Sequence, residues 1–122
     1  MRFHAVAVSA SVSGDYYQLY LGPEEDEDDD PFEAVGPYLL LQREFEISGR
    51  RCYIESENES YRGHFSLKLI EFSPSLLSFD IVRARDNHVE VTFALDAKDF
   101  EEVRRVAEVI FGLREPDEDD AL

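Results

Sequence analysis

Hydrophobic side chains recur with two different periods in the last third of the chain. Across residues 88–95 every second residue is apolar, which is typical of a strand with one buried face. After Asp96 the apolar residues recur at intervals of three and four, and this spacing predicts an amphipathic helix. Its apolar stripe consists of Phe100, Val103, Ala107, Ile110 and Phe111. Asp96 is placed to cap the start of this helix, and Gly112 is placed to end it.

Six segments before residue 88 carry strand-like patterns and are separated by turns or loops. They cover residues 3–12, 16–21, 38–47, 51–57, 65–72 and 76–82. Short connections favour antiparallel pairing of neighbouring strands. The sequence therefore predicts an α+β fold: a curved, mainly antiparallel β-sheet of about seven strands, with one C-terminal α-helix packed across its concave face. Arg43 shares a face with apolar residues, and we expect it to pair with a carboxylate or to lie at the rim of the sheet.

The negative charge of the chain is concentrated in two segments. The 122 residues suit one domain, which we place at residues 1–112, and the net charge is −16. An acidic loop at residues 22–37 contains Glu24, Glu25, Asp26, Glu27, Asp28, Asp29 and Asp30, and an acidic tail at residues 113–122 contains five more carboxylates. Removing these 12 charges leaves −4, so the folded body is only mildly acidic. We therefore expect no nucleic-acid binding, because that requires clustered Lys and Arg.

The sequence shows no pattern typical of a metal, cofactor or catalytic site. Cys52 is the only cysteine, and the three histidines are not spaced like metal ligands. A G-x-S-x-G elbow, a P-loop and a G-x-G-x-x-G motif are all missing. No apolar run approaches the roughly 18 residues of a membrane span, and no signal peptide is recognisable. We therefore expect a cytoplasmic protein that is not an enzyme, has no cofactor and does not bind membranes.

Two segments are candidates for binding a partner. In residues 53–63 the carboxylates of Glu55, Glu57 and Glu59 lie close in sequence to Tyr53 and Tyr61. Tyrosine and carboxylate side by side suit a protein interface, although an exposed strand end would have the same composition. The acidic loop, in the same way, is either a solvated loop or an electrostatic arm that attracts a basic partner.

A succession of motifs resembles the immunity protein 10 family of bacterial polymorphic toxin systems. The resemblance covers residues 37–112 and consists of YLLLQR at residues 38–43, YIESE at 53–57, SYRG at 60–63, a strand pair around residues 73–74, VEVTF at 89–93 and the closing helix. It implies a protein that binds and neutralises a cognate protein toxin by occlusion, without catalysis. The acidic composition suits a basic toxin, of which a nuclease is one candidate. The expected contacts are Tyr53, Glu55, Glu57, Glu59 and Tyr61, together with the loop of Glu24, Glu25, Asp26, Glu27, Asp28, Asp29 and Asp30.

Two other functions remain open from the sequence. A homo-oligomeric structural module would pair a sheet edge or helix face with a second copy, and a homodimer would then appear on sizing. A small-ligand-binding β-sheet domain would hold a metabolite under the helix, in a pocket lined by Tyr17, Phe65 and Phe79. A bound metabolite would raise the melting temperature by mass action.

Overall fold

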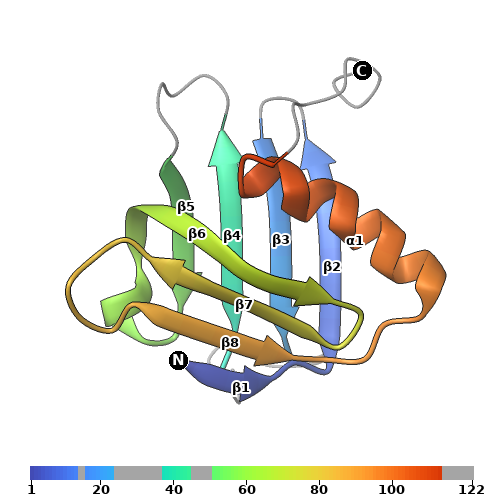
Figure 1. Ribbon diagram of the computed structural model, residues 1–122, viewed down its shortest axis with the longest axis horizontal. Coiled ribbons are helices and arrows are strands. Elements are labelled where there is room, and N and C mark those ends of the chain that lie inside the picture. Colours follow the sequence, from blue (N-terminus) through green and yellow to red (C-terminus); the bar gives the residue numbers. More distant parts are fainter. Residues whose placement is uncertain (14–15, 24–36, 45–50, 114–122) are drawn as a thin grey trace, which may run out of the picture.

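The computed structural model describes residues 1–13, 16–23, 37–44 and 51–113, which form an eight-stranded β-sheet and one α-helix (Figure 1). The predicted α+β class is confirmed. The strands are β1 (Arg2–His4), β2 (Ala7–Ser13), β3 (Tyr16–Gly22), β4 (Leu39–Glu44), β5 (Arg51–Ser56), β6 (Gly63–Ser73), β7 (Leu76–Ile81) and β8 (His88–Thr92). The helix is α1 (Ala97–Ile110), and a short 3₁₀ helix, η2 (Glu59–Tyr61), connects β5 to β6.

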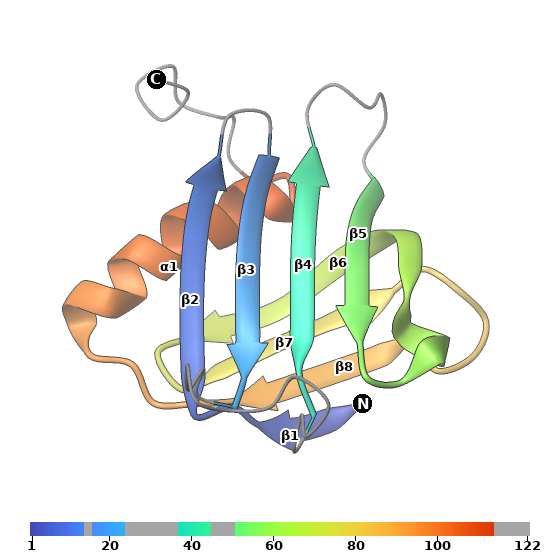
Figure 2. The same cartoon turned by 180° about the vertical axis from the view of Figure 1, so that it is seen from behind.

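The sheet bends so that its two halves face each other. The strand order is β1-β8-β7-β6-β5-β4-β3-β2, and each strand from β2 to β7 runs antiparallel to the next one in the chain. Strand β6 joins the halves, because its first residues pair with β5 and the residues from Leu67 onward pair with β7. Strands β2 to β5 form one layer. Strands β6 to β8 cross in front of this layer in Figure 1 and behind it in Figure 2.

The N-terminal segment forms two strands at opposite ends of the strand order, whereas the sequence predicted one. Strand β1 pairs with β8 in parallel, and β2 pairs with β3. Between them the N–H of Ala5 donates to the carbonyl of Thr92, and the N–H of Val6 donates to that of Gly22. The chain thus changes partner within two residues, a change that a continuous β-prone sequence cannot reveal. This division accounts for eight strands in place of about seven.

Helix α1 packs on the inner side of the bend, as predicted. It contacts β2, β3 and β4, and Figure 1 shows it on the same side of that layer as β6 to β8. The Asp96 carboxylate accepts a hydrogen bond of 2.8 Å from the N–H of Asp99, which confirms the predicted N-cap. The buried helix residues are Val103, Val106, Ala107, Val109 and Ile110. Within the described residues, no helix is long and apolar enough to cross a membrane.

The hydrophobic core lies between the two layers and the helix. Each of the strands β3, β4, β7 and β8 places alternate apolar side chains inside, as the period of two predicted. The residues buried from these strands include Leu19, Leu21, Leu39, Leu41, Leu77, Phe79, Val89 and Val91. Arg43, expected to pair with a carboxylate or to lie at the rim, donates a hydrogen bond to the carbonyl of Val109 at the end of α1.

Candidate functional site

The outward face of β5 carries the polar residues that the sequence singled out. Alternation along the strand buries Cys52, Ile54 and Ser56, and it turns the side chains of Tyr53 and Glu55 outward, where both are half-buried. Glu57 follows directly after the strand and is exposed. The strand predicted at residues 51–57 therefore has one buried face and one outward polar face.

Two carboxylates on this face are held by directed hydrogen bonds. The Glu55 carboxylate accepts one bond from the hydroxyl of Tyr53 at 3.0 Å and another from the hydroxyl of Tyr38 at 3.2 Å. The Glu57 carboxylate accepts bonds of 2.9 Å from the main-chain N–H of Tyr38 and from the Ser56 hydroxyl. We call Tyr38, Tyr53, Glu55 and Glu57 the acidic tyrosine surface. Its two negative charges are fixed in position before any partner arrives.

The electrostatics of this surface favour neutral tyrosines. Burial and the neighbouring Glu55 charge raise the pKa of Tyr38 above its ordinary value. The hydrogen bond to Glu55 is the main cause that raises the pKa of Tyr53. Both hydroxyls therefore stay protonated at neutral pH and remain donors to the carboxylate.

Tyr61 and Glu59 lie beside this surface in different environments. Glu59 is exposed in η2, where it could reach a partner. Tyr61 is only 6% exposed, its hydroxyl accepts a hydrogen bond of 3.2 Å from the N-terminal amine, and the Arg83 guanidinium lies 5.0 Å from its ring centre. The Tyr61 ring thus belongs to the core and has little surface left for a partner.

The remaining expected contacts fall outside the described residues. These are Glu24, Glu25, Asp26, Glu27, Asp28, Asp29 and Asp30 of the acidic loop. Tyr38, in contrast, is a member of the surface that the sequence did not single out. Pairing of β4 with β5 brings Tyr38 beside Glu55 and Glu57. This position follows from the register that places Leu39 opposite Ser56, which the sequence pattern does not specify.

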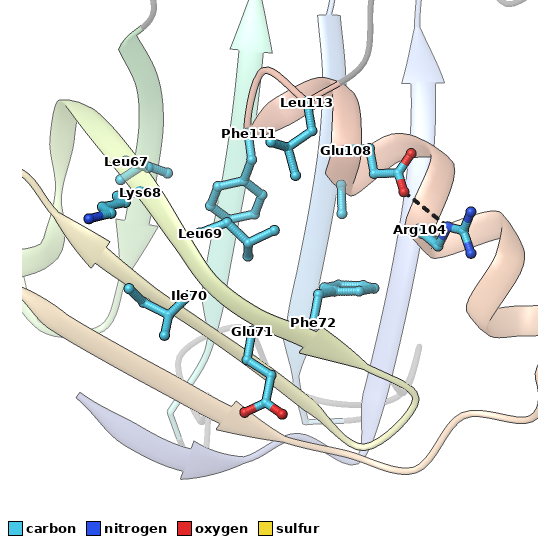
Figure 3. A pocket seen from close by; sticks show the side chains of 11 residues that line it. Leu67, Lys68, Leu69, Ile70, Glu71, Phe72, Arg104, Glu108, Phe111 and Leu113 are labelled. Carbon is cyan, nitrogen blue, oxygen red and sulfur yellow. Dashed lines mark hydrogen bonds and ion pairs between the residues drawn. The ribbon is translucent and has the colours of Figure 1, made fainter.

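A separate groove lies between β6 and α1 (Figure 3). It has a volume of about 460 Å³ and is lined by apolar side chains that include Leu69, Phe72, Phe111 and Leu113. The close-up shows the Phe111 and Leu113 side chains near Leu69, with the Arg104–Glu108 ion pair on the helix side.

The groove between β6 and α1 differs from the pocket predicted from Tyr17, Phe65 and Phe79, because none of these three residues lines it. Tyr17 and Phe79 are 3% and 0% exposed, so their side chains fill the core. The ring of Phe65 lies 5.1 Å from the Arg83 guanidinium carbon, near the β7–β8 connection. Two of the three residues expected to line a ligand pocket thus belong to the hydrophobic core.

Among the described residues, no group of three or more His, Cys, Asp and Glu side chains is arranged to hold a metal ion. Cys52 is buried, and its thiol donates to the carbonyl of Ile110 at 3.1 Å. Burial raises the pKa of this thiol to about 11, so it is neutral under ordinary conditions. No protein-family model and no curated protein matches this chain.

Proposed function

We propose that this protein binds a basic protein toxin through the acidic tyrosine surface and neutralises it by occlusion, as an immunity protein does. The observation that carries the proposal is the pair of carboxylates, Glu55 and Glu57, that four hydrogen bonds hold in place at the surface. The succession of motifs over residues 37–112 supports the same function.

Fixed carboxylates suit this role for two physical reasons. Negative charge on an exposed surface speeds the encounter with a basic partner and selects against acidic ones. Side chains that are already ordered lose less conformational entropy when the complex forms. Tyr38 and Tyr53 add aromatic area beside the charges, which is the composition of residues that anchor protein interfaces.

Neutralisation requires only that the bound protein cover the active site of the toxin. Glu59 extends the negative charge of the surface toward η2, and Arg62 fixes the connection by donating from Nε to the carbonyl of Ser56 at 2.7 Å. The proposed contacts on the described residues are therefore Tyr38, Tyr53, Glu55, Glu57 and Glu59. No chemical step by this chain is needed.

Growth rescue tests the proposal directly. This chain is co-expressed with the reading frame encoded beside its own gene, and surviving colonies are counted. We expect the neighbouring product alone to kill and this chain to restore growth. A neighbour that is harmless, or that kills in spite of this chain, would overturn the proposal.

A pair of matched variants assigns the rescue to the surface. Glu55→Gln combined with Glu57→Gln removes two negative charges from the acidic tyrosine surface and should abolish or weaken rescue. Glu101→Gln combined with Glu102→Gln removes the same charge from an exposed part of α1 and should leave rescue intact. Equal loss of rescue in both would show that overall charge, and not this surface, controls binding.

A further inference from the structure

An arginine lies beside the carboxylates of the acidic tyrosine surface. Arg62 follows η2 directly and is exposed, and its Nε donates a hydrogen bond of 2.7 Å to the carbonyl of Ser56. This bond uses the Nε donor and sets the direction of the side chain. The donors of Nη1 and Nη2 lie at the planar end of the guanidinium, where their spacing matches the two oxygens of a carboxylate.

The charge of Arg62 acts on both tyrosines of this surface. Burial and Glu55 raise the pKa of Tyr38, and the positive charge of Arg62 opposes that rise. At Tyr53 the hydrogen bond to Glu55 is the main cause of the raised pKa, and Arg62 again acts in the opposite direction. The guanidinium therefore lies near both hydroxyls, and it places a positive charge among the negative charges of the surface.

Arg62 has acidic neighbours in the chain, but its guanidinium is directed elsewhere. Glu55, Glu57 and Glu59 all precede it closely. Glu55 and Glu57 accept hydrogen bonds from hydroxyl and main-chain donors, and no carboxylate of the described residues forms an ion pair with Arg62. An exposed arginine at this point repels a partner that is basic throughout, because like charges brought together at an interface oppose binding.

We propose that Arg62 forms an ion pair with a carboxylate of the toxin, so that the acidic tyrosine surface selects a carboxylate flanked by basic residues. This inference rests on the proposed function and defines the chemistry of the partner more closely. Negative charge alone attracts basic proteins of every kind. A positive charge fixed within it favours only those that carry the complementary pattern.

General attraction and specific pairing predict opposite effects when the charge of Arg62 is removed. If the surface only attracted positive charge, Arg62→Gln would make it more negative and would strengthen the binding of a basic toxin. If Arg62 pairs with a carboxylate of the toxin, the same change leaves that carboxylate without its partner, and binding weakens. The direction of the change in Kd therefore distinguishes the two.

The purified product of the neighbouring reading frame is the probe, and its Kd for the full chain and each variant is measured by titration calorimetry. We expect Arg62→Gln to raise Kd by about tenfold or more. Arg62→Lys keeps the charge but loses the Nε donor, and it should retain more of the affinity than Arg62→Gln does.

Lys98→Gln is the matched control, because it removes the same charge from an exposed residue. Lys98 lies near the start of α1, on the opposite side of the fold from β5 (Figures 1 and 2). Its replacement should leave Kd unchanged or slightly lower, because the net charge becomes more negative at a distance from the contact.

Three results would overturn the inference and leave the proposed function in place. The first is a Kd for Arg62→Gln equal to or below that of the wild type. The second is equal weakening in Arg62→Lys and Arg62→Gln, since the lost hydrogen bond to Ser56 would then account for the effect. The third is a weakening that disappears when residues 24–30 are replaced by Ser and Gly, since Arg62 would then act through its own chain. A wild-type chain that neither binds nor neutralises the product would overturn both proposals.

Discussion

The guanidinium of Arg43 on β4 donates a hydrogen bond to the main-chain carbonyl of Val109 in the last turn of α1. The last carbonyls of a helix lack partners within the helix, and the helix dipole places partial negative charge there. This interaction explains why a cationic residue, Arg43, lies on the inner face of the sheet. It fixes the end of α1 to the strand beneath it.

Replacing Arg43 by Met should destabilise the fold. The change keeps much of the apolar side chain and removes a charged hydrogen bond, which is worth about 1.5–3 kcal/mol. Urea denaturation of the variant should show a loss in the free energy of unfolding in this range. Arg104→Met is the control, because its bonds to Glu101 and Glu108 are exposed helix pairs worth about 0.3–0.5 kcal/mol each. Equal losses in the two variants would contradict the proposed role of Arg43.

Gly112 ends α1 in a conformation that other residues adopt at a cost. Its φ is +76°, the N–H of Gly112 donates to the carbonyl of Val109, and the N–H of Leu113 donates to that of Glu108 at 2.8 Å. Gly112→Ala should lower the free energy of unfolding by about 1–2 kcal/mol, because a side chain disfavours the left-handed region. An added Cβ would lie 3.8 Å from the Arg43 side chain, so steric overlap does not contribute.

Thermal unfolding of Gly112→Ala and Gly112→Asn separates backbone strain from other causes. Asn tolerates the left-handed region better than Ala does and should lose less stability. A larger loss for Asn than for Ala would show that the space around the position, and not its φ angle, controls the effect.

The sequence predicted the features that depend on neighbouring residues. The helix, its Asp96 cap and its Gly112 terminus follow from spacing within one segment, and all three are confirmed. The outward face of β5 follows in the same way from alternation within six residues. Such patterns arise because the local backbone geometry sets which side chains share a face.

The sequence patterns did not predict the features that depend on pairing between distant segments. The change of partner at Ala5 and Val6, the position of Tyr38 beside Glu55 and the burial of Tyr61 all depend on which strands are neighbours. A period of two shows that a strand has two faces and says nothing about its edges.

Cys52 should resist thiol reagents in the folded protein. Its thiol is 1% exposed, and its pKa is raised from 9.0 to about 11 by burial. Because the thiolate is the reactive form, a rise of this size lowers its fraction at pH 8 by about 100-fold. Reaction with a chromogenic disulfide should therefore be slow without denaturant and fast in urea. Rapid reaction of the folded chain would contradict the burial of this side chain.

The pKa values of Tyr38 and Tyr53 should depend on Glu55. Both are raised above the ordinary value of 10.0, and Glu55 contributes to the rise at each hydroxyl. Glu55→Gln removes the negative charge, so the phenolate absorbance of the folded protein should develop at lower pH than in the wild type. Glu57→Gln is the control, because Glu57 accepts from the main-chain N–H of Tyr38 and not from its hydroxyl.

The same shifts predict how stability changes with alkaline pH. A folded-state pKa above the unfolded value means that the stabilising contribution is complete below pH 10.0 and disappears as pH rises through the folded-state pKa. The difference in the free energy of unfolding between the wild type and Glu55→Gln should therefore narrow as the pH rises from 10.0 through the folded-state pKa values of Tyr38 and Tyr53. Glu57→Gln should show no comparable narrowing. If the two variants titrate alike, the tyrosine hydroxyls do not bond to Glu55 in solution, and its carboxylate is not held in place before binding.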